Sequence, residues 1–350
     1  MKIFRQVGKE TLAMLGRHAG LSERSRYRTP GAVRILTYHR FRMGERRDST
    51  ACLSVRRFRE HLDHVSRAYE VIPLADAVRL VCGQRKEIQT TSRPPISITI
   101  DDGFEDSYLL AFPELRMRAI PATIFVVSSF VASGEPPWPS ELTAIIESVS
   151  TLRLADGRDV CVASELEREV AIRNLFRILE SRGAVERRSF LADLRRRNGV
   201  EHVRGELRPV TRTQLREMSA AGVEVGSHST HHTVLTKAPP GEARTEIEAS
   251  REAVGDMSGR PCRFFAYPDG KWTPAVASML DSAGYEGAVT QDWGLNVAPV
   301  NRFSLNRIEV PYFESARIFE ARVSGILRPR GHRRFGEPGY RGISAAQAGS

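Results

Sequence analysis

Short runs of apolar residues alternate along the chain with longer segments in which apolar residues recur every three to four positions. The runs have the length of strands and the segments have the length of helices. The candidate strands are RILTYH (34–39), VIPL (71–74), ISITID (96–101), ATIFVV (122–127), VEVGSHS (223–229), RFFAYP (263–268), GAVTQ (287–291) and NRIEV (306–310). Helical patterns cover 55–67, 74–82, 107–118, 163–182, 186–197, 212–221, 241–257 and 273–284. Strands separated by helices favour parallel pairing, so we expect an α/β fold, a distorted or incomplete (β/α) barrel of about seven to eight strands.

Three segments interrupt or flank this alternation. In residues 1–33, a helical pattern over 1–20 places apolar residues opposite lysines and arginines, and a polar linker follows. Residues 139–211 are rich in Arg and Glu and lack strong strand signals, so we expect a helical insertion there. Residues 328–350 are rich in Arg, Gly and Ala, and we expect them to be disordered. The barrel itself is therefore expected over residues 34–327.

The formal net charge of +10 is carried by the two ends of the chain. Residues 1–34 hold eight Lys and Arg against two Glu, and residues 328–350 hold five Arg against one Glu, which leaves the middle of the chain neutral. Enzymes of nucleic acids more often spread basic residues over their folded face, so we expect no nucleic-acid partner. The basic amphipathic pattern over 1–20 raises the hypothesis of peripheral contact with an anionic membrane, and solvated tails are the alternative.

The sequence contains no apolar run that approaches the length of a membrane span, and its first residues lack the features of a signal peptide. We therefore expect a cytoplasmic location. If segment 1–20 binds the membrane, the protein would lie peripherally at its inner face. The four cysteines lie far apart, which predicts neither a disulfide framework nor a cysteine-based zinc site. They are Cys52, Cys82, Cys161 and Cys262.

Residues able to carry chemistry follow the predicted strands, where parallel barrels place their active sites. Asp101 and Asp102 end the third candidate strand, and they point to opposite sides because strand residues alternate. His228 and His232 end a later strand with i,i+4 spacing, so both rings share one face if the chain turns helical there. One carboxylate and two imidazoles form a three-ligand set with open positions, which is typical of a catalytic divalent metal, most often zinc.

Such a metal lowers the pKa of water, and the remaining carboxylate can accept the proton of that water. Each motif alone has a simpler interpretation. A pair of Asp before Gly is often only a turn, and a His pair is often a surface feature. Their joint placement at strand ends favours the metal site, and His231 then points elsewhere, to the surface or to a supporting position.

These motifs resemble those of the polysaccharide deacetylases, the NodB-homology group of carbohydrate esterase family four. TIDDGFEDSY (99–108) is similar to the family's T-F-D-D-G-(Y/F)-x-D-x-Y segment, and GSHSTHHTVLT (226–236) resembles its G-S-H-(S/T)-x-x-H-x-x-L motif. FFAYPDG (264–270) is similar to F-A-Y-P-x-G. The resemblance covers roughly residues 33–325, and paired motifs in this order are specific.

The resemblance implies a role for each matched residue. Asp101 takes the place of the catalytic base, and Asp102, His228 and His232 take those of the metal ligands. The turn after Tyr267, formed by Pro268, Asp269 and Gly270, matches the segment whose backbone N–H helps to hold the oxyanion. Tyr267, Pro268 and Asp269 are therefore assigned to substrate binding. Trp293 is added as a ring that could stack on a sugar, as could Trp138, with core packing as the alternative for each.

The departures from the family pattern are informative. Many members carry an Arg where this chain has Ala266, and Arg307, in LNRIEV, is the candidate to orient Asp101 instead. The C-terminal L-x-H that usually supplies the general acid is missing, but ILTYHRF (35–41) resembles the I-L-x-Y-H segment of a circularly permuted branch that includes the poly-N-acetylglucosamine deacetylases. His39 can then occupy the place of the general acid, while a buried His tied to the backbone is the alternative.

The predicted function is a metal-dependent polysaccharide deacetylase, a hydrolase of carbon–nitrogen bonds that removes the N-acetyl group of an N-acetylated glycan or lipid-linked sugar. A non-haem metal oxygenase also uses two His and one carboxylate, but it would leave Asp101 without a role. A glycan-binding pseudoenzyme is the second alternative. The sequence offers no G-x-S-x-G, P-loop or G-x-G-x-x-G motif, so serine hydrolase and nucleotide-binding functions have no support.

Overall fold

The computed structural model describes residues 31–44, 52–83, 93–201, 207–312 and 314–327, together with residues 25 and 29. The predicted amphipathic segment over 1–20 and the predicted tail over 328–350 lie outside these residues. In the part of the chain that the structure describes, no helix has both the length and the apolar character needed to cross a membrane.

Seven parallel strands close into a barrel, and an eighth extends the sheet outside the ring. The ring runs in the order β1, β12, β11, β10, β9, β6, β5, and β1 pairs with β5 along its whole length to close it. β4 is paired to the outer side of β5. The predicted (β/α) barrel is confirmed, and each predicted strand is present: β1 (Arg34–Tyr38), β4 (Glu70–Val71), β5 (Pro95–Ile100), β6 (Thr123–Val126), β9 (Glu224–Ser227), β10 (Phe264–Ala266), β11 (Gly287–Trp293) and β12 (Leu305–Glu309).

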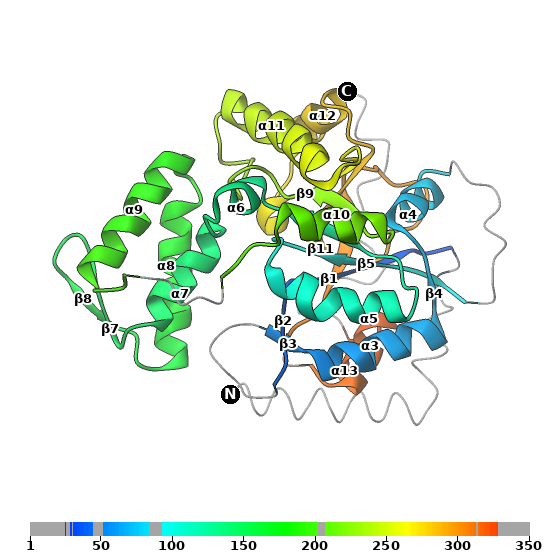
Figure 1. The fold of residues 1–350 in the computed structure, drawn as a ribbon, viewed down its shortest axis with the longest axis horizontal. Helices are drawn as coiled ribbons and strands as arrows, with labels where there is room; N and C mark the ends of the chain where they lie inside the picture. Colours follow the sequence, from blue (N-terminus) through cyan, green and yellow to red (C-terminus); the bar gives the residue numbers. More distant parts are fainter. Residues whose placement is uncertain are drawn as a thin grey trace, which may run out of the picture.

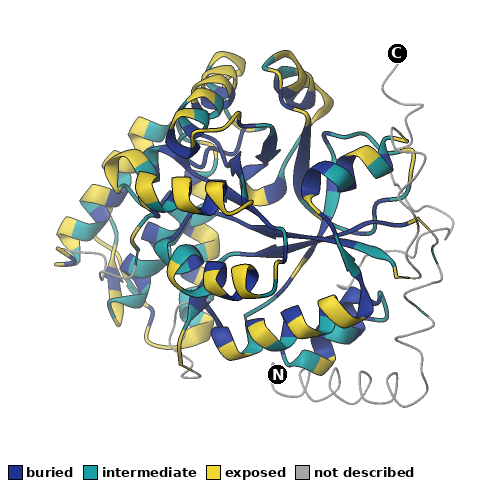
Figure 2. Cartoon of the chain, turned by 45° about the vertical axis from the view of Figure 1, so that its right-hand side comes forward, coloured by how far each residue is buried: buried dark blue, intermediate teal, exposed yellow. Residues whose placement is uncertain are grey.

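Helices surround the barrel and cover its strands on the outside (Figure 1). The covering helices bury one face each and expose the other, as Figure 2 shows, while the strands are buried because side chains pack on both of their faces. A short parallel pair, β2 (Arg40–Arg42) and β3 (Cys52–Ser54), follows β1. The covering helices are α3 (Val55–Ala68), α4 (Leu74–Val81), α5 (Phe112–Met117), α10 (Arg212–Ala220), α11 (Pro240–Ser258), α12 (Pro274–Ser282) and α13 (Ala316–Val323).

Helix α3 shows how the sequence determines this arrangement. Ser54 caps its first turn by accepting a hydrogen bond from the backbone N–H of Arg57, which satisfies an otherwise unpaired donor. Its buried residues recur every three to four positions and face the barrel, whereas the intervening charged residues remain outside. On the same side, the ring of His61 stacks on that of Phe319 from α13, with 3.8 Å between the ring centroids. Helices α3 and α13, which are far apart in the sequence, therefore pack side by side.

An insertion lies between β6 and β9 and projects to one side of the barrel, at the left of Figure 1. Its apolar side chains form a core of their own that includes Leu142, Ile145, Leu175 and Leu191. Helix α8 begins with a capping box between Ser164 and Glu167. The elements of this region are α6 (Ser128–Ser133), α7 (Trp138–Glu147), β7 (Thr151–Arg153), β8 (Asp159–Cys161), α8 (Glu165–Leu179) and α9 (Ala184–Arg197).

The insertion is not wholly helical, which corrects the sequence expectation. β7 and β8 form an antiparallel hairpin in which Leu152 pairs with Val160. The signal for it is the Asp156-Gly157 pair between two short alternating runs, and Gly157 takes the left-handed conformation that such a turn requires, with φ of 83°. A hairpin with strands of three residues is too short for alternation to stand out against the surrounding helices.

Candidate active site

The residues singled out in the sequence gather at the carboxyl ends of the barrel strands. Asp101 and Asp102 follow β5, and His39 follows β1, the neighbour of β5 in the ring. The register pairs Tyr38 with Ile100, and the N–H of Asp101 donates to the carbonyl of Tyr38 at 2.9 Å. His39 and Asp101 are therefore placed side by side by backbone pairing alone.

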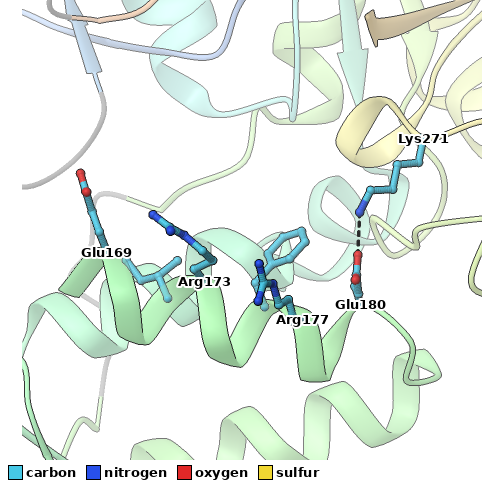
Figure 3. Close-up of a pocket in the computed structure, with 7 residues that line it drawn as sticks. Glu169, Arg173, Arg177, Glu180 and Lys271 are labelled. Carbon is cyan, nitrogen blue, oxygen red and sulfur yellow. Dashed lines mark hydrogen bonds and ion pairs between the residues drawn. The ribbon is translucent and has the colours of Figure 1, made fainter. Parts of the chain in front are cut away.

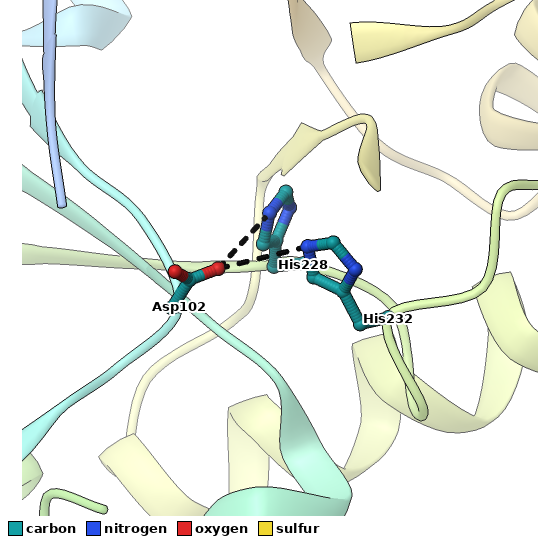
Figure 4. Close-up of side chains that lie close together, drawn as sticks. All are labelled: Asp102, His228 and His232. Atoms are coloured by element: carbon teal, nitrogen blue, oxygen red, sulfur yellow. Dashed lines mark ion pairs between the residues drawn. The ribbon is translucent and has the colours of Figure 1, made fainter. Parts of the chain in front are cut away.

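Asp102, His228 and His232 converge on one point (Figure 4). Oδ1 of Asp102 lies 3.6 Å from Nε2 of His228 and 3.6 Å from Nε2 of His232. Two donors that bind one divalent ion at about 2.0–2.2 Å with near-tetrahedral angles lie roughly 3.3–3.6 Å apart. The three side chains are largely buried, and two nitrogens with one oxygen are donors that zinc prefers. The residues present therefore fit a divalent metal.

The two histidines are brought together by a loop, not by the helical turn that the i,i+4 spacing had suggested. After β9 the chain is irregular, and Ser229 and His232 take left-handed backbone conformations, with φ of 64° and 53°. Asp102 is also left-handed, with φ of 76°. Such conformations cost of order 1–3 kcal/mol in residues other than glycine, and they persist where the surrounding structure enforces them. Left-handed residues at and beside a set of candidate ligands are typical of functional sites.

Hydrogen bonds orient this loop from behind. Nδ1 of His228 donates to the carbonyl of Ala266 at 2.7 Å, which fixes the tautomer that leaves Nε2 free to bind a metal. Glu246 accepts hydrogen bonds from the backbone N–H groups of Thr230 and His231, and from Nδ1 of His231. His231 therefore lies away from the ligand set and supports the loop. Burial, together with the positive charges of His228 and Arg187, lowers the pKa of His232 and keeps it neutral, the form that can bind a metal.

Asp101 is paired with Arg307 in the barrel interior. Nη1 of Arg307 donates to Oδ1 at 2.8 Å and Nη2 donates to Oδ2 at 2.7 Å, a two-pronged geometry in which both side chains are fully buried. Arg307 is held in turn by the carbonyl of Thr290 and the hydroxyl of Thr99. Burial would raise the pKa of Asp101, but the charge and hydrogen bonds of Arg307, with His228 and His39 nearby, lower it to about 2.

His39 lies at the open side of this arrangement. Its Nε2 is 4.0 Å from Oδ2 of Asp101, too far for a hydrogen bond but within reach of a small adjustment, and one third of its side chain is exposed. Together with Asp102 it lines a cavity of about 330 Å³, whose walls include Tyr312 and, from the insertion, Pro139 and Ser140. His39 is therefore not a core histidine tied to backbone.

Comparison with known proteins bears on this geometry. The sequence model of the family described as polysaccharide deacetylase matches residues 181–288, which include His228, His232 and the turn at 268–270. This segment of the chain matches the polysaccharide deacetylase family, which its motifs also resemble. The predicted enzyme class, a hydrolase of carbon–nitrogen bonds, is confirmed with it.

Two solved structures and one curated relative extend the likeness beyond the matched segment. YxkH of Bacillus subtilis (strain 168), a protein assigned to the polysaccharide deacetylases, is 18% identical over 298 residues, which are 85% of this chain and 78% of YxkH. The deacetylase PplD of Streptococcus pyogenes, solved in complex with acetate, has a TM-score of 0.56 at 17% identity, over 82% of this chain and 96% of PplD. IcaB from Ammonifex degensii has a TM-score of 0.54 at 20% identity, over 84% of this chain and 97% of IcaB. These structures share the fold.

The residues assigned to substrate binding have different outcomes in the structure. Tyr267 is fully buried and its hydroxyl donates to the carbonyl of Phe303, so its side chain belongs to the core and offers no surface to a substrate. Pro268 is also buried, whereas Asp269 is exposed and left-handed, with φ of 57°. Trp293 is half-buried at the end of β11, where the register pairs it with Arg307. Asp269 and Trp293 are thus the members of this set that reach the surface near the site.

The turn at 268–270 is tied to the insertion through Lys271. Nζ of Lys271 lies 2.7 Å from Oδ2 of Asp269. It also lies 2.7 Å from Oε2 of Glu180, at the end of α8 (Figure 3). Lys271 and α8 border a groove of about 390 Å³, whose lining includes Arg173, Phe176 and Arg177. The insertion therefore reaches one edge of the candidate site at this turn.

Two further residues near the site make contacts that the sequence did not indicate. The indole N–H of Trp138 donates to the carbonyl of the ligand residue His232 at 2.9 Å, so this buried Trp supports the loop and does not stack on a sugar. Arg40 lines the cavity beside His39, donates to Oδ2 of Asp106 at 2.7 Å, and lies over the ring of Phe104. Burial raises the pKa of Asp106 to about 6, although Arg40 opposes the rise. The only available signal for Trp138 was general: a buried indole N–H needs an acceptor.

Proposed function

We propose that this protein is a metal-dependent N-deacetylase that hydrolyses the acetamide of an N-acetylated glycan or lipid-linked sugar. The observation that carries the proposal is the juxtaposition of a buried, arginine-bound carboxylate with a separate set of three metal-binding donors at the same strand ends. Hydrolysis of an amide needs an activated water, a base and an acid, and this arrangement offers a residue for each task.

Asp102, His228 and His232 would hold a divalent cation, and zinc is the ion expected from two imidazoles and one carboxylate. When bound, such an ion polarises the amide carbonyl and lowers the pKa of water. The residues of the chain prepare this site by lowering the pKa of His232 and by aiming both Nε2 atoms at Oδ1 of Asp102.

Asp101 is proposed as the base that takes the proton of the attacking water. Its low pKa keeps it ionised at neutral pH, and Arg307 holds its plane fixed. A base of such low pKa binds the proton only briefly, so the proton has to move on. His39, with Nε2 4.0 Å from Oδ2 of Asp101, is in position to deliver a proton to the leaving amine.

The oxyanion that forms during attack needs a fixed donor. We assign this role to the backbone N–H of Asp269, in a turn whose shape is fixed by close packing. A Cβ at Gly270 would lie 2.3 Å from the backbone nitrogen of Gln291, so only glycine fits this position. A rigid turn of this kind holds its donors without rearrangement during the reaction, which is the condition for stabilising developing charge.

The relatives support the choice of substrate class. PplD is described in complex with acetate, the product that deacetylation releases, and another structure of the same fold carries the description de-N-acetylase. The contact of residues 1–20 with a membrane and the location of the protein remain predictions from the sequence.

The test is metal analysis of the purified full-length protein, followed by assay of acetate release from oligomers of N-acetylglucosamine. We expect about one equivalent of zinc per chain, and loss of acetate release on chelation with recovery on adding zinc back. Asp281→Asn, on an exposed residue of α12 paired with Arg302, is the matched surface control and should behave as wild type. A zinc-loaded protein that binds the oligomers but releases no acetate would overturn the proposal in favour of the pseudoenzyme.

A further inference from the structure

The two metal-binding histidines are supported in different ways. The ring of His228 is fixed directly, because its Nδ1 donates to the carbonyl of Ala266. The ring of His232 has no such bond: its Nδ1 is buried and has no hydrogen-bond partner among the described residues. A metal-binding histidine usually donates its second N–H to a fixed acceptor, which sets the orientation of the ring. Another part of the structure must therefore define the position of His232.

The contacts that define it come from the insertion. The indole N–H of Trp138, the first residue of α7, donates to the backbone carbonyl of His232 at 2.9 Å. Nη2 of Arg187, near the start of α9, donates to Oγ1 of Thr233 at 2.7 Å. Arg187 is itself anchored by the carbonyl of Arg182, and its guanidinium lies 5.5 Å from the centroid of the Trp138 ring.

These bonds act on a stretch of backbone that would not keep its shape unaided. His232 and Ser229 are both left-handed, and neither is glycine. Within the loop, the N–H of Thr233 donates to Oγ of Ser229 at 3.2 Å, which closes a small ring but does not attach it to the barrel. Trp138 and Arg187 attach this ring to the core of the insertion.

We propose that Trp138 and Arg187 are positioning residues for the metal ligand His232, so that the insertion acts as the outer support of the metal site. The proposal rests on the metal site of the proposed function. It predicts that removing a single hydrogen bond in the insertion weakens metal binding, although neither residue belongs to the ligand set.

The first test is Trp138→Phe, which removes the indole N–H but keeps an aromatic ring against Phe176. Metal-free protein would be titrated with Co²⁺, whose visible absorption reports the geometry of its ligands. Because one hydrogen bond is lost, we expect the Kd for Co²⁺ to rise about 3- to 10-fold and the absorption band to change shape. An unchanged Kd and band would overturn the proposal.

The matched control is Asn198→Ala. Asn198 holds the insertion together by bonds to the backbone of Arg153 and Leu194, and it does not contact the His232 loop. We expect this variant to melt at a lower temperature but to bind Co²⁺ with the wild-type Kd. If it weakened Co²⁺ binding as much as Trp138→Phe does, general destabilisation of the insertion would explain the effect, and the positioning role would be wrong.

Thr233→Val is the second variant and guards against misfolding of Trp138→Phe. Valine has nearly the same shape as threonine, so the substitution removes only the acceptor of the Arg187 bond. We expect a smaller rise in the Kd for Co²⁺, about 2- to 5-fold. Failure of the proposed function is distinguishable, since wild-type protein would then bind no Co²⁺ at this site. Failure of the positioning role would leave wild type and both variants equal.

Discussion

Asp101 and His232 lie in the same candidate site, but different parts of the molecule hold them. Asp101 is fixed inside the barrel by Arg307, which is itself bound by groups of β5 and β11. His232 lies in a loop with left-handed backbone, and the bonds to its own carbonyl and to the next residue, Thr233, come from an insertion that adds no strand to the ring. The position of the proposed base thus depends on strand register, whereas the position of the proposed ligand depends in part on a separately packed unit.

The sharpest test of this difference is the pair of variants Asp101→Asn and Asp102→Asn. Asp101→Asn should lower kcat by about 10²- to 10⁴-fold and leave the zinc content unchanged, because it removes proton transfer alone. Asp102→Asn should lose zinc, because it removes a ligand. Zinc analysis alongside acetate release checks both, and loss of zinc from Asp101→Asn with retention in Asp102→Asn would reverse the two roles.

Arg307→Met tests whether the base depends on the barrel. It leaves the Asp101 carboxylate buried without its partner, which should lower the free energy of unfolding by about 3–5 kcal/mol. Urea denaturation of the metal-free protein measures this loss. Arg302→Met, which breaks the exposed pair with Asp281, is the control and should cost about 1 kcal/mol or less. Equal losses in the two variants would show that the interior pair has no special importance.

His39→Ala tests the proposed general acid, which follows barrel strand β1 and lies beside Asp101. We expect kcat to fall by about 10²-fold or more, with zinc content intact, because no proton would be delivered to the leaving amine. Full activity in this variant would show that the proton donor lies elsewhere.

The pH dependence of stability gives the smallest effect. The pKa of Asp101 is about 2, below the roughly 3.9 of an unfolded aspartate. A pKa that folding lowers adds stability that is complete above the unfolded pKa and is lost as the pH falls through the folded one. Metal-free wild type should therefore lose on the order of 2 kcal/mol between about pH 4 and pH 2. Asp101→Asn should show a flatter curve there, as measured by urea denaturation at each pH.

The barrel could be predicted from the sequence because its strands are short apolar runs, buried on both faces, and because helices separate them. Helix α13 was missed, since eight residues from Ala316 to Val323 give too few turns for a period to be recognised. Helix α6 is shorter still, at six residues, and was missed for the same reason. The hairpin of β7 and β8 was missed although it contains an Asp-Gly turn.

The candidate site was predictable to the extent that its residues stand at strand ends. The sequence predicted Asp102, His228 and His232 as the set of candidate ligands. It did not predict the loop that brings the two rings together, because residues spaced i,i+4 can also meet without a helix. The bond from Trp138 to His232 joins positions 94 apart, and no local pattern encodes it. Contacts of that kind depend on how two separately folded parts meet, which only the three-dimensional structure shows.

Closure of the ring by β1 has a consequence for the order in which the protein can fold during synthesis. β1 leaves the ribosome first, yet its partners β5 and β12 follow about 60 and 270 residues later. Arg307, the partner of Asp101, lies in that last strand. For most of its synthesis, a nascent chain therefore contains His39 and Asp101 without Arg307. The proposed reactive centre can assemble only after β12, the final barrel strand, has emerged. Long-range pairing of this kind slows folding, and here it also ensures that incomplete chains remain without the reactive centre.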